Sequence, residues 1–301
     1  ENIVMQRKKQ FLQDGGDLFI TICGIVVILL TAVVLYPLIY VFSASFSSAS
    51  AVSSGRMWLW PVDITLEGYK YVLQYRYVWI GYRNTILYSL VGTTIGLAIT
   101  MACAYPLARN KLRGRNFFTL LFTVTMVFNG GMIPNYILMQ KLGMINTVWA
   151  MILPGCMSVY NMIVAKSFIQ SSIPGELLEA SKIDGCSDAK FFFRIVLPLS
   201  RTILAVLGIM YMSSHWNAYF NAFLYLKDRD LFPLQLFLRQ ILVQSNFDSQ
   251  MLDPEAVAQM QTLQMLLKYS VIVIATAPML CLFPFFQKYF DKGILIGSLK
   301  G

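Results

Sequence analysis

Six apolar stretches dominate this chain, and each is long enough to cross a lipid bilayer as a helix. The hydrocarbon core of a bilayer needs about 20 consecutive, mostly apolar residues in a spanning helix. The stretches lie at about residues 18–44, 84–108, 117–138, 147–169, 196–222 and 266–288. The sequence therefore predicts an all-α integral membrane protein with six transmembrane helices.

The composition agrees with a membrane protein. The chain is 57% hydrophobic and 13% charged, with a mean hydropathy of +0.60, whereas soluble domains are about 25% charged. The net charge of +9 could suggest nucleic acid as a partner, but the basic residues cluster beside apolar segments, so we expect none. The first apolar stretch is far longer than the core of a signal peptide, which has about 7–15 residues, and is expected to remain as a helix.

The distribution of Lys and Arg predicts the orientation in the membrane. With a cytoplasmic N-terminus, the inside segments hold most of the 24 basic residues, and the positive-inside rule then places both termini in the cytoplasm. The expected layout is a cytoplasmic segment 1–17, a first transmembrane helix 18–44, an extracytoplasmic loop 45–83, a core of five helices over 84–288 and a cytoplasmic tail 289–301. The inside basic residues are Arg7, Lys8, Lys9, Arg109, Lys111, Arg113, Arg115, Lys166, Lys182, Lys190, Arg194, Arg201, Lys288, Lys292 and Lys300.

A charged segment, "EASKIDGCSDAKFFFRIVLPLS" from Glu179 to Ser200, interrupts the apolar pattern on the predicted cytoplasmic side. Ser172 is a plausible helix cap, Pro174 suits a first turn and Gly185 is a stop signal, which together predict one short helix. Its apolar stripe would consist of Leu177, Ala180 and Ile183.

A second short helix is expected directly afterwards. Ser187 is its predicted cap, and Pro198 marks the break before the next transmembrane stretch. From composition alone, such a helix–glycine–helix elbow could equally be a solvated loop.

The spacing within this segment resembles a known signature. Glu179-Ala180-Ser181, three residues, Gly185, nine residues, and then Ile195, one residue and Leu197-Pro198 is similar to the EAA loop of permease subunits of binding-protein-dependent ABC importers. Ser181 replaces the second Ala, which is a change between small residues. The stretches "NGGMIPNYILMQKLGMINTVWAMILPG", "HWNAYFNAFLYLKDRDLFPLQLFLR" and "DKGILIGSLKG" resemble the carbohydrate-uptake branch of that family.

The resemblance implies a type I importer permease with six spans and an EAA loop at 170–198, which contains a cytoplasmic coupling helix that docks in a cleft of an ATPase. It implies as partners a second homologous permease, two ATP-binding cassette subunits that bind ATP and Mg, and an extracellular sugar-binding protein that delivers an oligosaccharide. The chain, in a bacterial cytoplasmic membrane, would be a transport subunit without enzyme activity or a cofactor of its own, since it contains no GxxxxGK[ST] motif. The implied coupling residues are Glu179, Ala180, Ser181, Asp184, Gly185, Ile195, Leu197 and Pro198.

Polar and aromatic residues within the apolar stretches are candidates for the substrate pathway, because sugars suit aromatic faces together with amide and hydroxyl partners. The alternatives are hydrogen bonds between helices, aromatic residues at the membrane interface, and sugar contacts held mainly by the second permease. The candidates are Asn129, Tyr136, Tyr160, Asn161, Trp216, Asn217, Tyr219 and Asn221.

Other classes of membrane protein fit less well. His215 is the only histidine, and no paired carboxylates or metal-ligand clusters lie in a span, which argues against a membrane enzyme. A secondary transporter would be expected to carry intramembrane carboxylates or an inverted repeat. An ABC importer for a non-sugar solute stays open, because such permeases share the same loop.

Overall fold

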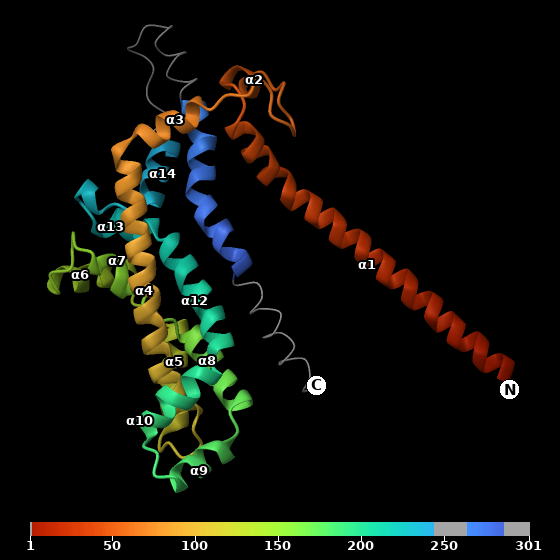
Figure 1. The fold of residues 1–301 in the computed structure, drawn as a ribbon, viewed down its shortest axis with the longest axis vertical. Coiled ribbons are helices and arrows are strands. Elements are labelled where there is room, and N and C mark those ends of the chain that lie inside the picture. Colours follow the sequence, from red (N-terminus) through yellow and green to blue (C-terminus); the bar gives the residue numbers. More distant parts are fainter. Residues whose placement is uncertain (1, 244–263, 286–301) are drawn as a thin grey trace. The chain divides into compact units, whose positions relative to one another are not determined.

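The computed structural model describes residues 2–243 and 264–285, with side chains from Phe19 to Ile241 and from 264 to 285 (Figure 1). The predicted tail 289–301, residues 244–263 before the last predicted span, and the residues Lys288, Lys292 and Lys300 lie outside the described residues. The side chains of Arg7, Lys8 and Lys9 do as well. Every regular element within the described ranges is helical, as the composition predicted.

The chain divides into two compact units, Glu1–Val72 with Ser245–Val273 and Leu73–Gln244 with Ile274–Gly301. In the first unit, α1 (Asn2–Ser45) is followed by the short α2 (Ala49–Ser53) and by α3 (Glu67–Gln74). The hydroxyls of Ser45 and Tyr69 lie 2.7 Å apart, and the rings of Tyr40 and Tyr269 meet edge to face. These contacts connect the end of α1 with α3 and with the last apolar helix, whose described part is Gln264–Phe285.

The second unit is built around α4 (Arg76–Ala108), against which α8 (Val159–Ser172) and α12 (Arg201–Trp216) pack. Two glycines permit the close approach, which is how helices commonly associate in membranes. A Cβ atom on Gly92 would collide with the His215 ring, and one on Gly96 would lie 2.8 Å from the Cys156 carbonyl oxygen. The buried core that results includes Met101, Ala104, Leu107, Met162, Ala165 and Leu207.

Three of the predicted spans are bent pairs of helices. The stretch 117–138 divides into α5 (Arg115–Val127) and α6 (Met132–Lys141), which meet at 110°. The stretch 147–169 divides into Trp149–Gly155, which contains α7 (Trp149–Ile152), and α8, at 51°. The stretch 196–222 begins within the helical segment Asp188–Leu199, which ends in α11 (Leu197–Leu199), and continues in α12. This segment and α12 meet at 79°. By length and composition, the described residues contain three single helices that could cross a membrane, or up to six if each bent pair is one span.

Local sequence explains the bends, which the apolar pattern alone did not show. Gly131 has a φ of +86°, a conformation that only glycine adopts without strain, so α5 cannot continue into α6. Pro154 lies in a 3-10 turn, Leu153–Gly155, directly after α7. The Ser158 hydroxyl then caps the start of α8 by accepting from the Asn161 N–H. The second predicted span also differs, since α4 begins at Arg76 and not at residue 84.

The segment after α12 returns to the first half of α4. It contains α13 (Tyr219–Tyr225), a 3-10 turn at Arg229–Leu231 and α14 (Leu234–Val243). The Asn84 amide donates to the carbonyl oxygens of Asp230 and Phe232, at 2.7 and 3.1 Å, and the Thr85 hydroxyl accepts from the Leu234 N–H at 2.9 Å. Figure 1 shows α14 beside this half of α4, while α9 and α10 lie at the other end.

Candidate coupling site

The charged segment folds as a helix–turn–helix elbow, defined here as residues 175–191. It consists of α9 (Gly175–Ile183) and α10 (Asp188–Phe191), joined by a turn at Gly185, whose φ is +70°. Gly185 therefore ends the first helix as predicted, and the Ser187 hydroxyl caps the second by accepting from the Lys190 N–H at 3.3 Å.

One predicted cap is wrong. Ser172 is the last residue of α8, and the extended Pro174 occupies the cap position of α9 without a side-chain hydrogen bond. The preceding helix runs longer than expected because nothing in its last turn breaks it before Ile173, which adopts an extended conformation.

The predicted apolar stripe of α9 faces away from the rest of the described chain. Leu177 is 42% exposed and Ile183 is 87% exposed, and Ala180 is exposed between them. The opposite face makes the internal contacts: Leu178 packs on the core, and the Ser181 hydroxyl is buried and donates to the Leu178 carbonyl. An amphipathic helix thus directs apolar side chains outward, and the described chain covers Leu177 only in part and leaves Ile183 almost fully exposed.

Two ion pairs connect the elbow to the loop that follows α4. Arg109 Nη1 lies 2.9 Å from Asp188 Oδ1, and the Arg109 guanidinium also lies over the Tyr105 ring at 5.2 Å. Lys111 Nζ lies 3.6 Å from Glu179 Oε1. The first pair is partly shielded, since the Arg109 side chain is only 18% exposed, whereas Lys111 and Glu179 are 77% and 68% exposed.

The shielded ion pair between Arg109 and Asp188 stabilises a negative charge on the elbow. Asp188 lies in the charged elbow and not in an apolar stretch, and the hydrogen bond from Arg109 holds the pKa of its carboxyl below the usual value. Asp188 therefore stays ionised, and the loop after α4 holds α10 by a charge-assisted contact.

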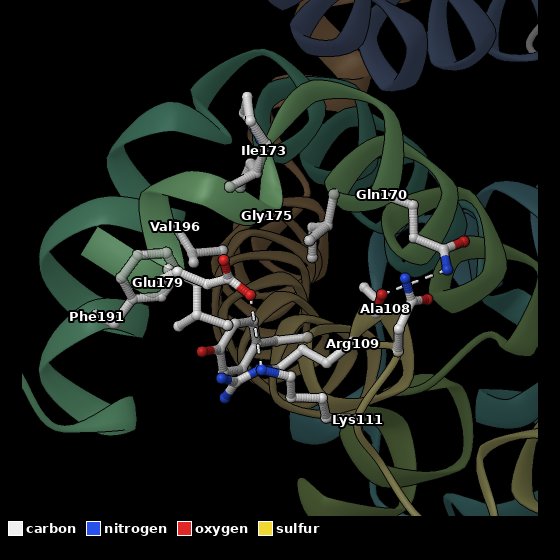
Figure 2. A pocket seen from close by; sticks show the side chains of 14 residues that line it. Ala108, Arg109, Lys111, Gln170, Ile173, Gly175, Glu179, Phe191 and Val196 are labelled. Carbon is white, nitrogen blue, oxygen red and sulfur yellow. Dashed lines mark hydrogen bonds and ion pairs between the residues drawn. The ribbon is translucent and has the colours of Figure 1, made fainter. Parts of the chain in front are cut away.

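A pocket of about 260 Å³ separates the elbow from this loop (Figure 2). Figure 2 shows the side chains around it, with the Glu179–Lys111 pair and a hydrogen bond from Gln170 to the Ala108 carbonyl drawn as dashed lines. Ile173 and Gly175 border it at the start of α9, and Phe191 and Val196 border it from the end of α10 and the next turn. The pocket is thus lined by apolar side chains as well as by these polar contacts.

The remaining predicted coupling residues follow the elbow. Phe192–Val196 forms one π-helical turn, a rare widening that often occurs at functional sites. Ile195 and Leu197 are half-buried against the core, whereas Pro198 is exposed before the bend at Ser200. The predicted set therefore divides into an exposed group (Glu179, Ala180, Asp184, Gly185 and Pro198) and a packed group (Ser181, Ile195 and Leu197).

Comparison with known proteins assigns the chain to a protein family. Residues 16–296 match the family described as binding-protein-dependent transport system inner membrane component. The chain belongs to this family. The family membership expected from the sequence is thereby confirmed, and the chain is called the permease below.

Relatives of the permease include sugar transport proteins. It is 39% identical over 272 residues to protein LplC of Bacillus subtilis, covering 90% of each chain. It is 38% identical over 268 residues to the polygalacturonan/rhamnogalacturonan transport system permease protein YtcP of the same organism, covering 88% of this chain and 92% of the relative. A crystal structure of a bacterial ABC transporter involved in the import of the acidic polysaccharide alginate contains a similar chain, with a TM-score of 0.80, 30% identity and coverage of 91% and 96%.

The structure does not gather the predicted pathway residues of the permease in one place. Asn129 lies in the break between α5 and α6, where its side-chain oxygen accepts from the Gly131 N–H. Tyr136 stacks on Tyr225 with ring centroids 6.1 Å apart. On α8, Tyr160 is 55% exposed and Asn161 is buried.

The candidates near the end of α12 also differ from one another. Trp216 is buried, and its ring N–H donates to the Ala275 carbonyl at 3.1 Å. The Asn217 amide donates to the Ser213 carbonyl one turn earlier, and Asn221 is half-buried. Tyr219 is 40% exposed, and the guanidinium of Arg239 lies 5.2 Å from its ring centre.

Sequence reasoning did not single out Arg239. Its guanidinium also lies 4.8 Å from the ring centre of Phe223, one turn after Tyr219 on α13. The available signal was the pair of aromatic residues four positions apart on one helix, since such residues share a face.

Proposed function

We propose that the permease is one transmembrane subunit of an ATP-driven importer for oligosaccharides, which an extracellular binding protein delivers. It works with a second homologous permease and two ATP-binding cassette subunits, which bind ATP and Mg. The observation that carries the proposal is the outward apolar stripe of α9, Leu177, Ala180 and Ile183, bordered by the exposed carboxylate of Glu179.

The chemistry of the elbow suits a protein cleft. An exposed apolar stripe on a short charged helix contacts water at a cost unless a partner covers it. Ala180 permits a close approach of backbones, the turn at Gly185 has no Cβ atom to collide with a partner, and Glu179 can pair with a basic residue. The elbow is thus the docking surface for the ATPase, and the loop after α4 holds it in place through Arg109.

The orientation follows from the same assignment. α4 has 33 residues and is about 50 Å long, which exceeds the hydrocarbon core of about 30 Å, so its two ends lie on opposite sides of the membrane. Ala108 and the elbow face the cytoplasm, and Arg76 lies at the extracytoplasmic end. With each bent pair counted as one span, the permease has six spans in total, and both termini lie in the cytoplasm.

Topology can be measured directly. In a cysteine-free background, Ser187→Cys should react with a membrane-impermeant maleimide only after the cytoplasmic side is opened, and Arg76→Cys should react in intact cells. Labelling of Ser187→Cys from outside would contradict both the orientation and the docking role of the elbow.

An oligosaccharide is the substrate class that the relatives favour. YtcP is named as a polygalacturonan/rhamnogalacturonan permease, and a third relative, AraQ of Halalkalibacterium halodurans, which is 30% identical over 276 residues, as an arabinooligosaccharide permease. ATP closure of the two ATPases would move the elbows together and alternate the access of a site between the two permeases, as expected for such rigid-body transporters.

Reconstitution tests the function. The permease, purified with its co-expressed second permease, ATPase and binding protein and placed in liposomes, should accumulate labelled oligosaccharide only with ATP and binding protein present. Accumulation of a non-sugar solute in place of any oligosaccharide would overturn the substrate class. Transport by a complex without a nucleotide-binding chain would overturn the whole proposal.

A further inference from the structure

A cluster of one basic and two aromatic side chains lies at the end of the second unit that is remote from the elbow. It consists of Arg239 on α14 with Tyr219 and Phe223 on α13, and is called the arginine–aromatic cluster. Tyr219 and Phe223 are 40% and 59% exposed, and Arg239 is half-buried beside them.

Within the described residues, the Arg239 side chain is held by aromatic rings and not by polar partners. Its guanidinium lies over both rings, 5.2 and 4.8 Å from their centres, so cation–π contacts with two rings position it. Within the described ranges, none of the side-chain hydrogen bonds or ion pairs involves Arg239. A guanidinium whose N–H groups have no partner among the described residues matches a carboxylate, which it can bind through two parallel hydrogen bonds.

The aromatic rings add a second recognition element. A pyranose ring has an apolar C–H face that packs on an aromatic side chain, and its hydroxyl and carboxyl groups project from the edge. A sugar ring placed on Tyr219 or Phe223 would therefore bring a carboxyl substituent to the edge of the neighbouring guanidinium. A neutral sugar would use the rings and leave the guanidinium unsatisfied, and an inorganic anion would use only the guanidinium.

The position of the cluster fits an entry site. α14 packs on the first half of α4 through Leu234 and Phe237, which contact Gly81. Gly81 is 27 positions before Ala108, which corresponds to about 40 Å along the helix. The cluster thus lies near the extracytoplasmic end of α4, where a substrate leaving a binding protein would first meet the permease.

We infer that the arginine–aromatic cluster is a recognition site for sugars that carry a carboxylate, so that the permease accepts uronate-containing oligosaccharides. Arg239 binds the carboxylate, and Tyr219 and Phe223 support the sugar ring. This inference rests on the proposed transport function and narrows its substrate class.

The test compares charged and neutral substrates of the same length. Liposomes containing the whole complex and its binding protein receive either tetragalacturonate or the same oligomer with its carboxyl groups reduced to alcohols. Arg239→Gln should lower the kcat/KM of tetragalacturonate uptake about tenfold or more, because a hydrogen bond to a charged group is lost. It should change uptake of the reduced oligomer less than about twofold, and Arg239→Lys should fall between Arg239→Gln and the unaltered protein.

Arg76→Gln is the matched control, since it removes one exposed positive charge at the same end of α4. It should leave both substrates within about twofold of the unaltered complex, which separates a local contact from a general effect of charge. Equal losses on both oligomers for Arg239→Gln, or no loss on the charged one, would overturn the inference. Uptake of neutral oligosaccharides but not of tetragalacturonate would also overturn it while leaving the proposed function intact. If the complex takes up no saccharide, the proposed function fails first.

Discussion

Reversing the charge of Glu179 separates docking to a partner from contacts within the chain. In the described chain, the carboxylate lies 3.6 Å from Lys111, and both side chains are more than two-thirds exposed. An exposed ion pair of this kind contributes about 0.2–1 kcal/mol, so Glu179→Lys should destabilise the permease itself by no more than about 1–2 kcal/mol. Insertion in the membrane should survive.

The effect on docking should be much larger. If Glu179 pairs with a basic residue in the ATPase cleft, reversal places two positive charges together in a desolvated interface, and loss of one partner of such a pair costs about 2–5 kcal/mol. Since 1.4 kcal/mol is tenfold in affinity, binding of the ATPase should weaken by about 30-fold to several-thousand-fold.

The chain supplies a sharp control for this experiment. The double variant Glu179→Lys/Lys111→Glu restores the internal ion pair with its charges exchanged, but it does not restore a carboxylate to α9. Both variants should therefore lose uptake and binding-protein-stimulated ATP hydrolysis, measured in vesicles with matched subunit levels. Lys111→Glu alone should be milder, because it leaves Glu179 in place.

Two outcomes would refute this reasoning. Normal uptake by Glu179→Lys would mean that the elbow is a solvated loop. Recovery of uptake in the double variant would mean that Glu179 acts through Lys111 and not through a partner subunit.

Two further predictions concern contacts within the permease. Arg109→Asp and Asp188→Arg should each reduce coupled ATP hydrolysis, because each breaks the 2.9 Å ion pair that holds α10. The double variant with both residues exchanged should recover part of the loss. Equal defects in the single variants and the double variant would show that the pair does not position the elbow. Gly92→Ala should lower the free energy of unfolding of the purified permease by about 1–3 kcal/mol, because the new Cβ collides with the buried His215 ring. Gly24→Ala should leave it unchanged, because a Cβ atom at Gly24 has no neighbour within 4 Å among the described residues.

The sequence was most informative where one physical requirement dominates. Apolar length predicted membrane helices, and glycine and serine chemistry predicted the turn at Gly185 and the cap at Ser187, both of which the structure contains. Pro198 predicted the break at Ser200, but the other two bends were not predicted, because a run of apolar residues has the same pattern whether its helix is straight or broken. The Gly131 conformation and the Pro154 region show where the breaks come from only once the backbone is known.

The candidate sites show a similar limit. The helical spacing of Leu177, Ala180 and Ile183 predicted one face of α9, but spacing cannot tell whether that face points inward or outward. The Lys111–Glu179 pair and the arginine–aromatic cluster join residues 68 and 16 or more positions apart, and they depend on how the helices pack. Local sequence patterns carry no information at that range.

The docking role of the elbow can be tested most directly by cross-linking at Ile183, the most exposed residue of the apolar stripe. Ile183→Cys, in a cysteine-free permease purified with its co-expressed subunits, should form a cross-link to a nucleotide-binding subunit through a short bifunctional reagent, and ATP should change its yield. A transport-active complex in which this cysteine forms no such cross-link and accepts a bulky maleimide without loss of uptake would contradict the account.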